Sequence, residues 1–199
     1  MPYKFEFFIN HHLFFSANLV CERCIGKTRN GTECKRKVCI GMPYCFQHLL
    51  KEKHLKIAKS TLPNSGKGLF AYNPQQRPNA TIFQQEATIC EYDGEIINTK
   101  TLRQRYDKYT APYAIQKTNN QYIDDALYRS IGSLANHKSI DKGANAVFIG
   151  HKKKIILMAI RPIRNGDEIF VDYSQDYLFD EPTEHKTIYV KNKSMDNIK

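Results

Sequence analysis

Short apolar runs bounded by turn residues dominate the chain after about residue 55. The runs have strand length and are rich in apolar or β-branched residues: Ala87–Tyr92, Ala144–Ile149 and Lys154–Ile160, with alternating polarity over Glu168–Tyr173. Turn signals separate them at Asn64-Ser65-Gly66, Asp93-Gly94 and Asn165-Gly166-Asp167. Only two stretches have a helical pattern, Thr99–Tyr109 and Leu127–Asn136. The pattern predicts a mainly β domain with few short helices.

The N-terminal segment, residues 1–20, contains the most apolar stretch of the chain, Phe5–Val20. Polar residues such as Glu6 and Asn10 interrupt it and no small-residue cleavage site follows, so it does not match a secretion signal. No run of eighteen apolar residues occurs in the sequence, which predicts that no helix crosses a membrane. We expect residues 1–20 to belong to the fold.

Composition and charge add a preference for certain partners. The 199 residues suffice for one ordinary domain and a small appendage, and the 41% hydrophobic content is typical of a folded protein. The formal net charge of +10 favours contact with nucleic acid, an anionic surface or an acidic partner. The basic excess is concentrated in residues 1–56, which carry ten basic and four acidic side chains.

Five of the six cysteines lie close together, in the series Cys21-x2-Cys24-x9-Cys34-x4-Cys39-x5-Cys45-x2-His48. This series offers six ligands where a tetrahedral zinc needs four. So short a segment cannot bury enough apolar surface to fold alone, and metal ligation would supply the missing free energy. The pattern therefore predicts zinc rather than disulfides, and a reducing intracellular compartment. The alternative is a set of buried free thiols.

Part of this series resembles a small zinc-binding motif that recurs in proteins of large eukaryotic DNA viruses and of some eukaryotes. The matching residues are Arg23-Cys24-x3-Thr28-x2-Gly31-x2-Cys34-x-Arg36 and Gly41-x2-Tyr44-Cys45-x2-His48. The resemblance implies Cys24, Cys34, Cys45 and His48 as the ligands, while a rival set that uses Cys21 or Cys39 stays open. Together with a Lys/Asn/Ile-leaning composition, it also suggests a viral source with an AT-rich genome.

The motifs of the larger unit are weak when taken singly. Gly66-Lys67-Gly68 lacks the other residues of a phosphate loop or a dinucleotide fingerprint, and most such glycine pairs are turns. Asn136-His137 fits a helix end, Gly166-Asp167-Glu168 a hairpin corner, and Tyr173 a core aromatic. Their order along the chain is more informative than any one of them.

In that order, five segments resemble the successive signatures of a SET-domain protein lysine methyltransferase. They are residues 65–71, 91–97, 122–124, 134–137 with Asn145-Ala146, and 160–173. The resemblance covers residues 55–179 and leaves a zinc-binding module at 21–50 and a polar tail at 180–199. It implies a β-clip fold of small sheets with a pseudoknot, in which the segment ending at Tyr173 is threaded beneath the loop around Asn136. It also implies S-adenosylmethionine as the methyl donor.

The resemblance also implies roles for individual residues. Tyr173 would be the catalytic tyrosine and Tyr92 a wall of the lysine channel, and Phe148 matches a position where the family varies between Phe and Tyr. The cofactor would be held by Gly66, Lys67, Gly68, Asn136, His137, Tyr173 and Phe179. Such a channel suits the chemistry, because only a neutral amine attacks the methyl group and an apolar aromatic channel lowers the pKa of lysine.

Two departures from the family pattern concern the cofactor loop and the closure of the channel. The family usually has Asn-His-Ser where this chain has Asn136-His137-Lys138, followed by a longer loop over residues 139–143. No cysteine follows Cys90, so the zinc-binding cysteine triad of many relatives is missing. We expect Tyr177-Leu178-Phe179 to close the channel, with Phe179 over the adenine or in the core.

The sequence therefore predicts a protein-lysine N-methyltransferase acting on a histone or another chromatin-associated or viral protein. The basic zinc module would contact a partner such as nucleic acid or chromatin, in the host nucleus or cytoplasm or in the virion. The alternative is an inactive zinc-dependent adaptor, and a nucleic-acid methyltransferase is disfavoured because no doubly wound α/β alternation occurs. Basic histone tails would require an acidic groove, for which the candidates are Glu91, Asp93, Glu95, Asp124, Asp125, Asp172, Asp176, Asp180 and Glu181.

Overall fold

The computed structural model describes residues 3–9, 12–19, 21–38, 43–106, 111–128, 130–151 and 154–173. Within these ranges the protein consists of small β-sheets with two short α-helices, α1 (Phe46–Lys53) and α2 (Thr99–Tyr106), and two 3-10 turns, η1 (Ile131–Leu134) and η2 (Ile140–Lys142). The prediction of a mainly β fold with few short helices is confirmed. Cys39, Phe179 and the tail at 180–199 lie outside the described residues.

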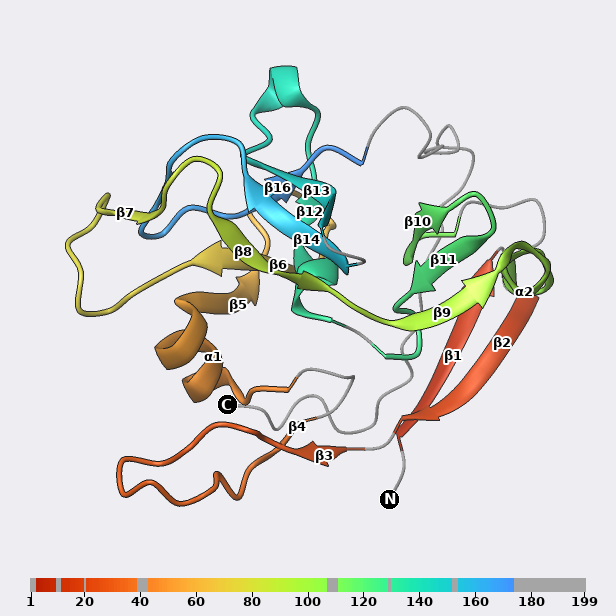
Figure 1. The fold of residues 1–199 in the computed structure, drawn as a ribbon, viewed down its shortest axis with the longest axis horizontal. Helices are drawn as coiled ribbons and strands as arrows, with labels where there is room; N and C mark the ends of the chain where they lie inside the picture. Colours follow the sequence, from red (N-terminus) through yellow and green to blue (C-terminus); the bar gives the residue numbers. More distant parts are fainter. Residues whose placement is uncertain are drawn as a thin grey trace.

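The N-terminal quarter forms two hairpins, and α1 follows them. Strands β1 (Tyr3–Ile9) and β2 (His12–Leu19) pair antiparallel, as do the two-residue strands β3 (Glu22–Arg23) and β4 (Lys37–Val38). In Figure 1 the β1–β2 hairpin lies beside α2, and the loop between β3 and β4 extends below α1. No helix in the described part of the chain has the length and apolar character that crossing a membrane requires.

The stretch Lys51–Lys59 joins the Cys/His-rich segment to the main β domain and is part of the folded core. Its first residues end α1, and Leu55–Lys59 form strand β5, which pairs antiparallel with β6 (Lys67–Ala71). Leu55 is fully buried. The hairpin turns back at Asn64 and Gly66, which both have positive φ, as the turn signal there predicts.

A five-stranded sheet forms the centre of the molecule, with the order β12-β16-β13-β14-β8. Its strands are β8 (Thr88–Tyr92), β12 (Asn136–His137), β13 (Ala146–His151), β14 (Lys154–Ala159) and β16 (Phe170–Val171). Strand β16 lies between β12 and β13 and is parallel to both, so the chain's last described segment passes through the loop that joins them. This is the threaded arrangement that the resemblance implied.

Two smaller sheets complete the fold. Strands β9 (Glu95–Asn98), β10 (Ala114–Thr118) and β11 (Gln121–Asp124) form a sheet in the order β10-β11-β9, which Figure 1 places to one side of the central sheet. Strands β7 (Thr81–Phe83) and β15 (Ile163–Arg164) pair antiparallel. The main core lies between the central sheet, the β5–β6 hairpin and α1.

The helix predicted over Leu127–Asn136 is wrong. Only Ile131–Leu134 are helical, as a single 3-10 turn, and Asn136 begins β12. Gly132 and Ser133 have low helix propensity, and parallel pairing with β16 holds Asn136 and His137 extended. Gly132 also lies against strand β8, where a Cβ would be 3.2 Å from the Glu91 carbonyl oxygen.

Candidate active site and metal centre

Four buried ligand atoms converge between the β3–β4 hairpin and the start of α1. They belong to Cys24, Cys34, Cys45 and His48, and all lie within 4.8 Å of one another. His48 Nδ1 is 3.4 Å from Cys24 Sγ and 3.3 Å from Cys45 Sγ. Cys45 immediately precedes α1, so one helical turn places Cys45 and His48 side by side.

The surroundings of this cluster prepare it for a metal ion. His48 Nε2 lies 2.8 Å from the Lys27 carbonyl oxygen, so Nε2 carries the proton and donates it there, which leaves Nδ1 as the ligand atom. Cys24 Sγ accepts hydrogen bonds from the backbone N–H groups of Gly26 and Cys45. Burial opposes ionisation of the Cys45 thiol, but hydrogen bonding outweighs it, above all from the His48 backbone N–H, and lowers the pKa of Cys45 to about 6.

The donor set fits zinc. Three sulfur atoms and one imidazole nitrogen, buried together, are the ligands of a closed structural zinc site. Gly26 packs against the His48 ring so closely that a Cβ would collide with it. Zinc bound there would be held by Cys24, Cys34, Cys45 and His48 and would crosslink the β3–β4 hairpin to α1.

The remaining cysteines differ from the four ligands. Cys21 is disulfide-bonded, so the prediction of zinc ligation rather than disulfides is wrong at this residue, and Cys21 drops out of the rival ligand set. Burial raises the pKa of the Cys90 thiol on β8 to about 12, which makes it an inert packing residue.

The glycine-flanked bend before and at the start of β6 lies against Asn136. Asn136 Nδ2 donates to the Lys67 carbonyl oxygen at 3.2 Å and to Glu168 Oε1 at 3.1 Å. A Cβ at Gly68 would collide with the Glu168 carboxylate and lie 3.1 Å from Asn136 Nδ2, so only glycine permits this approach. At Gly66, by contrast, the space around the backbone is open. The predicted cofactor residues Gly66, Lys67, Gly68 and Asn136 are thus brought together.

His137 and Tyr173 adjoin this bend. The Tyr173 backbone N–H donates to His137 Nδ1 at 3.1 Å, and the two ring centroids are 5.2 Å apart. Burial lowers the pKa of His137, in agreement with an Nδ1 that accepts a hydrogen bond. The Tyr173 hydroxyl donates to the Ala135 carbonyl oxygen at 2.7 Å. The threading of β16 past β12 is what places Tyr173 beside His137.

Tyr92 and Phe148 form an aromatic corner next to these residues. Their rings meet edge to face with centroids 5.0 Å apart, and the Tyr92 hydroxyl donates to the Tyr113 carbonyl oxygen at 2.8 Å. Phe148 packs against both the main core and the small cluster around Tyr92, and Tyr173 also packs against the main core. Burial, with the nearby Asp125 carboxylate, raises the pKa of Tyr92 well above its usual value. Tyr92 therefore stays neutral at physiological pH.

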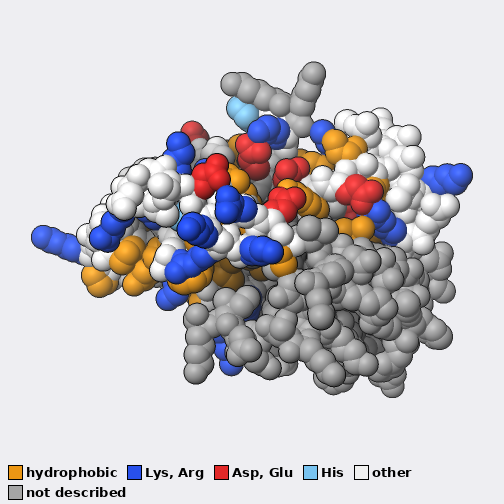
Figure 2. All heavy atoms as spheres, turned by 90° about the horizontal axis from the view of Figure 1, so that it is seen from below, with side chains coloured by type: hydrophobic (Ala, Val, Ile, Leu, Met, Phe, Trp, Pro, Cys, Tyr) orange, Lys and Arg blue, Asp and Glu red, His pale blue; other side chains and the backbone are white. Residues whose placement is uncertain are grey.

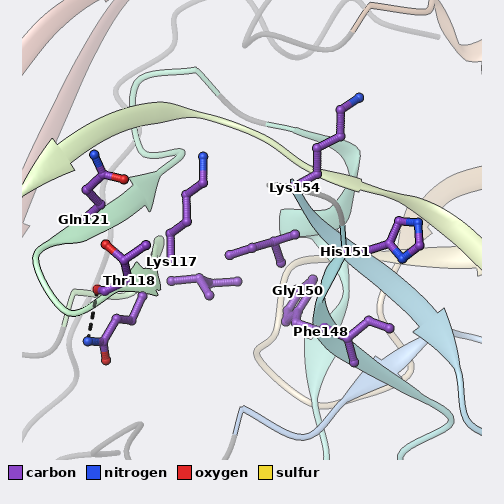
Figure 3. Close-up of a pocket in the computed structure, with 11 residues that line it drawn as sticks. Lys117, Thr118, Gln121, Phe148, Gly150, His151 and Lys154 are labelled. Atoms are coloured by element: carbon purple, nitrogen blue, oxygen red, sulfur yellow. Dashed lines mark hydrogen bonds between the residues drawn. The ribbon is translucent and has the colours of Figure 1, made fainter.

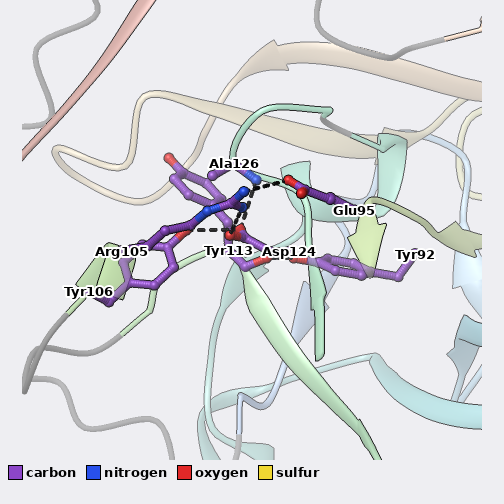
Figure 4. A network of polar contacts seen from close by, with 7 residues as sticks. All are labelled: Tyr92, Glu95, Arg105, Tyr106, Tyr113, Asp124 and Ala126. Atoms are coloured by element: carbon purple, nitrogen blue, oxygen red, sulfur yellow. Dashed lines mark hydrogen bonds and ion pairs between the residues drawn. The ribbon is translucent and has the colours of Figure 1, made fainter. Parts of the chain in front are cut away.

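A buried polar network supports the segment around Tyr113, whose backbone carbonyl accepts the hydrogen bond from the Tyr92 hydroxyl (Figure 4). The fully buried Asp124 carboxylate accepts hydrogen bonds from Arg105 at 2.7 Å and from the Tyr106 hydroxyl at 2.8 Å. Arg105 also pairs with Glu95. Burial and the Asp124 charge raise the pKa of Tyr106. From the sequence, Asp124 and Glu95 were expected in two of the SET-type segments and as candidates for an acidic groove, and their pairing with Arg105 was not predicted.

Glu168 and Asn145 make more hydrogen bonds than their sequence motifs suggest. The Glu168 carboxylate accepts hydrogen bonds from Ser60 Oγ, from the Thr61 N–H and hydroxyl at 2.7 and 2.6 Å, and from Asn136. The Asn145 side chain donates to the Glu168 carbonyl oxygen and accepts from the Phe170 N–H, both at 2.8 Å. The sequence signals that point to these two residues are the Gly166-Asp167-Glu168 corner and the motif that contains Asn145.

The unusual loop after Asn136-His137 is well anchored. Lys138 Nζ lies 3.9 Å from the centroid of the Phe170 ring, a cation–π contact. The Asp172 carboxylate accepts the Ile140 N–H at 3.0 Å, and Arg161 donates to the Gly143 carbonyl oxygen at 2.9 Å. The departure from Asn-His-Ser is therefore accommodated without displacing His137, whose backbone still pairs with β16.

Comparison with known proteins agrees with this geometry. The family model described as SET domain matches residues 19–174. The histone-lysine N-methyltransferase, H3 lysine-4 specific, of Cryptococcus neoformans is 29% identical over 138 residues, which are 65% of this chain and 9% of that protein. The H3 lysine-36 specific enzyme of Chaetomium globosum is 30% identical over 98 residues, 44% of this chain and 10% of that protein. The chain thus spans about a tenth of the length of these relatives.

Solved structures share the fold. The structure of ctPRC2, the polycomb repressive complex 2 of Chaetomium thermophilum, in an autoinhibited conformation bound to S-adenosylmethionine, matches with a TM-score of 0.50. The sequences are 23% identical, and the match covers 63% of this chain and 16% of that chain. At this identity the likeness concerns the fold alone.

Proposed function

The chain belongs to the SET domain family, and we propose from this membership that it is a protein-lysine N-methyltransferase. S-adenosylmethionine would supply the methyl group as an electrophilic sulfonium. The observation that carries the proposal is the convergence of Tyr173, the Asn136-His137 step and the glycine-flanked bend beside the aromatic pair Tyr92 and Phe148. The polar, half-buried donors and the open backbone at Gly66 fit a cofactor of that kind.

The aromatic walls would prepare the lysine. Tyr92 and Phe148 offer apolar ring surface, which disfavours the ammonium form and so lowers the pKa of a lysine between them. The neutral amine then has a lone pair for attack on the methyl group. Tyr173, whose hydroxyl is fixed on the Ala135 carbonyl, would orient the reacting methyl through weak C–H···O contacts. The catalytic gain would come mostly from positioning.

The Tyr173 hydroxyl provides the first test. We expect Tyr173→Phe to lose about 10²-fold or more in methyl transfer, comparable to the loss of one well-placed hydrogen-bond donor. Labelled S-adenosylmethionine with recombinant histones and a cell extract would measure transfer, and calorimetry would measure cofactor binding, which should persist in the variant. The half-exposed Tyr128, changed to Phe, is the matched control. Equal transfer by Tyr173→Phe and wild type, or no cofactor binding by wild type, would contradict the proposal.

Some finer expectations stay predictions. The relatives compared above are named for lysine 4 and for lysine 36 of histone H3, and they do not agree on one target. Lys and Arg side chains on the face shown in Figure 2 are interspersed with Asp and Glu, and nothing found supports binding to nucleic acid. The viral source stays a prediction too, since both of those relatives are fungal.

A further inference from the structure

A groove of about 610 Å³ opens beside the aromatic corner (Figure 3). Its walls come from β10 and β11 on one side and from the β13–β14 hairpin on the other. Phe148, Ile115 and Ile155 line the groove and also pack in the small cluster that holds Tyr92. The groove therefore adjoins the outer face of the proposed lysine channel.

The groove runs between two strand edges. Strand β10 stands at the end of its three-stranded sheet and pairs only with β11 among the described residues. Strand β13 pairs with β16 only at Ala146, so in the described part of the chain Phe148–His151 have a strand neighbour on one side alone. Two such edges suit an extended peptide, which can pair its backbone with either of them. A nucleic acid has no equivalent backbone to pair with a strand edge.

The ionisable side chains that line the groove are all basic. Lys117, His151 and Lys154 line it, and none of the described lining residues is acidic. Lys117 is half-buried, and no hydrogen bond or ion pair involving its amine is found among the described residues. Lys154 pairs with Glu91 at 2.8 Å, but both side chains are more than half exposed, so an incoming carboxylate can compete for this pair.

Four of the carboxylates that had been candidates for an acidic groove are engaged elsewhere, whereas Glu91 and Asp93 lie near Lys154 of the groove. The remaining candidates, Asp176, Asp180 and Glu181, lie outside the described residues. Asp124 and Glu95 bind Arg105, and Asp172 accepts the Ile140 N–H. Asp125 is fully buried and accepts hydrogen bonds from Ser130. None of these four carboxylates lines the groove, and no acidic side chain is among its described lining residues.

We infer that the groove selects a peptide with acidic residues next to the target lysine, so that the substrate is an acidic segment of a protein rather than a basic histone tail. Lys117 is the principal specificity residue, and Lys154 contributes once Glu91 is displaced. In Figure 3 both lysine side chains extend toward the same side of the groove, where a peptide carboxylate can meet them. This inference rests on the proposed function, since it places the target lysine next to Phe148.

The test uses the full chain and two peptides that differ only in charge. Each peptide carries one lysine, flanked by Asp and Glu in one and by Arg in the other. We expect kcat/KM for methyl transfer to be about tenfold higher for the acidic peptide at low salt, as two partly exposed charge pairs allow. The preference should shrink as salt is raised. Anisotropy of the labelled peptides with S-adenosylhomocysteine present gives the same comparison as dissociation constants, independent of turnover.

Variants with altered charge then test whether the groove causes the preference for the acidic peptide. Lys117→Glu should abolish or reverse the preference for the acidic peptide, and Lys117→Met should reduce it. Lys100→Glu on α2, outside the groove, makes the same charge change as Lys117→Glu and should leave the preference intact. Thermal unfolding of each variant identifies any loss of fold. Equal or higher affinity for the basic peptide overturns the inference while leaving the methyltransferase proposal standing. An oligonucleotide that competes as well as the acidic peptide also overturns it. Absence of cofactor binding instead overturns the proposed function.

Discussion

Glu168 connects three parts of the cofactor side of the molecule through one carboxylate. Ser60 and Thr61 follow β5, Asn136 begins β12, and Glu168 itself precedes β16. Burial opposes ionisation of this carboxyl, but the hydrogen bonds from Thr61 and Ser60 outweigh it and lower its pKa below the usual 4.5. The charged form is therefore the one that the folded protein stabilises.

This carboxylate makes stability depend on pH. Because the pKa is lower in the folded state, Glu168 stabilises the native state at pH values above about 4.5 and loses this effect as the pH falls through the lowered pKa. Glu168→Gln places an amide donor against the Thr61 and Asn136 donors, so we expect a loss of about 2 kcal/mol at neutral pH. Urea unfolding at pH 7 and at pH 3.5 measures both effects. The difference between variant and wild type should be smaller at pH 3.5; an unchanged difference would contradict this role.

At the level of single residues, the sequence predicted which side chains lie close together only where these residues are near each other in the chain. Cys45 and His48 lie one helical turn apart, so their spacing alone places both ligands on one side of α1. The pairing of Tyr92 with Phe148 could not be read from spacing, since these residues lie on β8 and β13 and meet only through the order of the central sheet. Glu168 was missed for the same reason, because its donors at Ser60 and Thr61 are more than one hundred positions away.

At the scale of elements, the strongest apolar runs became strands close to their predicted bounds. Ala87–Tyr92 contains β8, and Lys154–Ile160 contains β14. The alternating run at Glu168–Tyr173 yields only the two-residue strand β16, because side-chain bonds from Asn145 take over the pairing around it. The periodicity of apolar residues cannot reveal that a side chain makes the hydrogen bonds that the backbone of a neighbouring strand would otherwise make.

Asn145 is accordingly the residue that fixes β16 against β13. Its side chain bonds the Glu168 carbonyl and the Phe170 N–H, and its backbone N–H bonds the Phe170 carbonyl. Asn145→Ala leaves two buried backbone groups without partners, so we expect a loss of about 2–4 kcal/mol. Urea unfolding measures the loss, and cofactor affinity should fall with it because β16 positions Tyr173.

A second variant separates the two hydrogen bonds. Asn145→Asp keeps an acceptor for the Phe170 N–H but opposes the Glu168 carbonyl with another acceptor. It should therefore also be destabilised, and more so at pH 7 than at a pH where the aspartate is protonated. An Ala variant as stable as wild type would show that backbone pairing alone holds β16.

At the scale of the whole molecule, the Cys/His cluster and the main core share side chains. Tyr44 packs against both the cysteine cluster and the main core, and Leu49 of α1 is buried in that core. Strand β5 follows α1 after a single residue, His54, whose backbone turns in the left-handed region. The cluster is thus joined rigidly to the β5–β6 hairpin, which presents the glycine-flanked bend.

This connection predicts that metal removal destabilises the whole molecule. Structural zinc contributes folding free energy outright, and a loss of several kcal/mol lowers Tm by about 10 °C or more in a chain of this size. Metal analysis should find one zinc per chain, and treatment with a strong chelator should lower Tm in a single transition and weaken cofactor binding. Cys34→Ser should do the same and lose the metal. Cys90→Ala, which removes a thiol outside the cluster, should keep the zinc and cost only a few degrees. If the chelated protein instead showed two separate transitions with unchanged cofactor affinity, the cluster would be an independent appendage, and the packing of Tyr44 and Leu49 would not couple it to the active site.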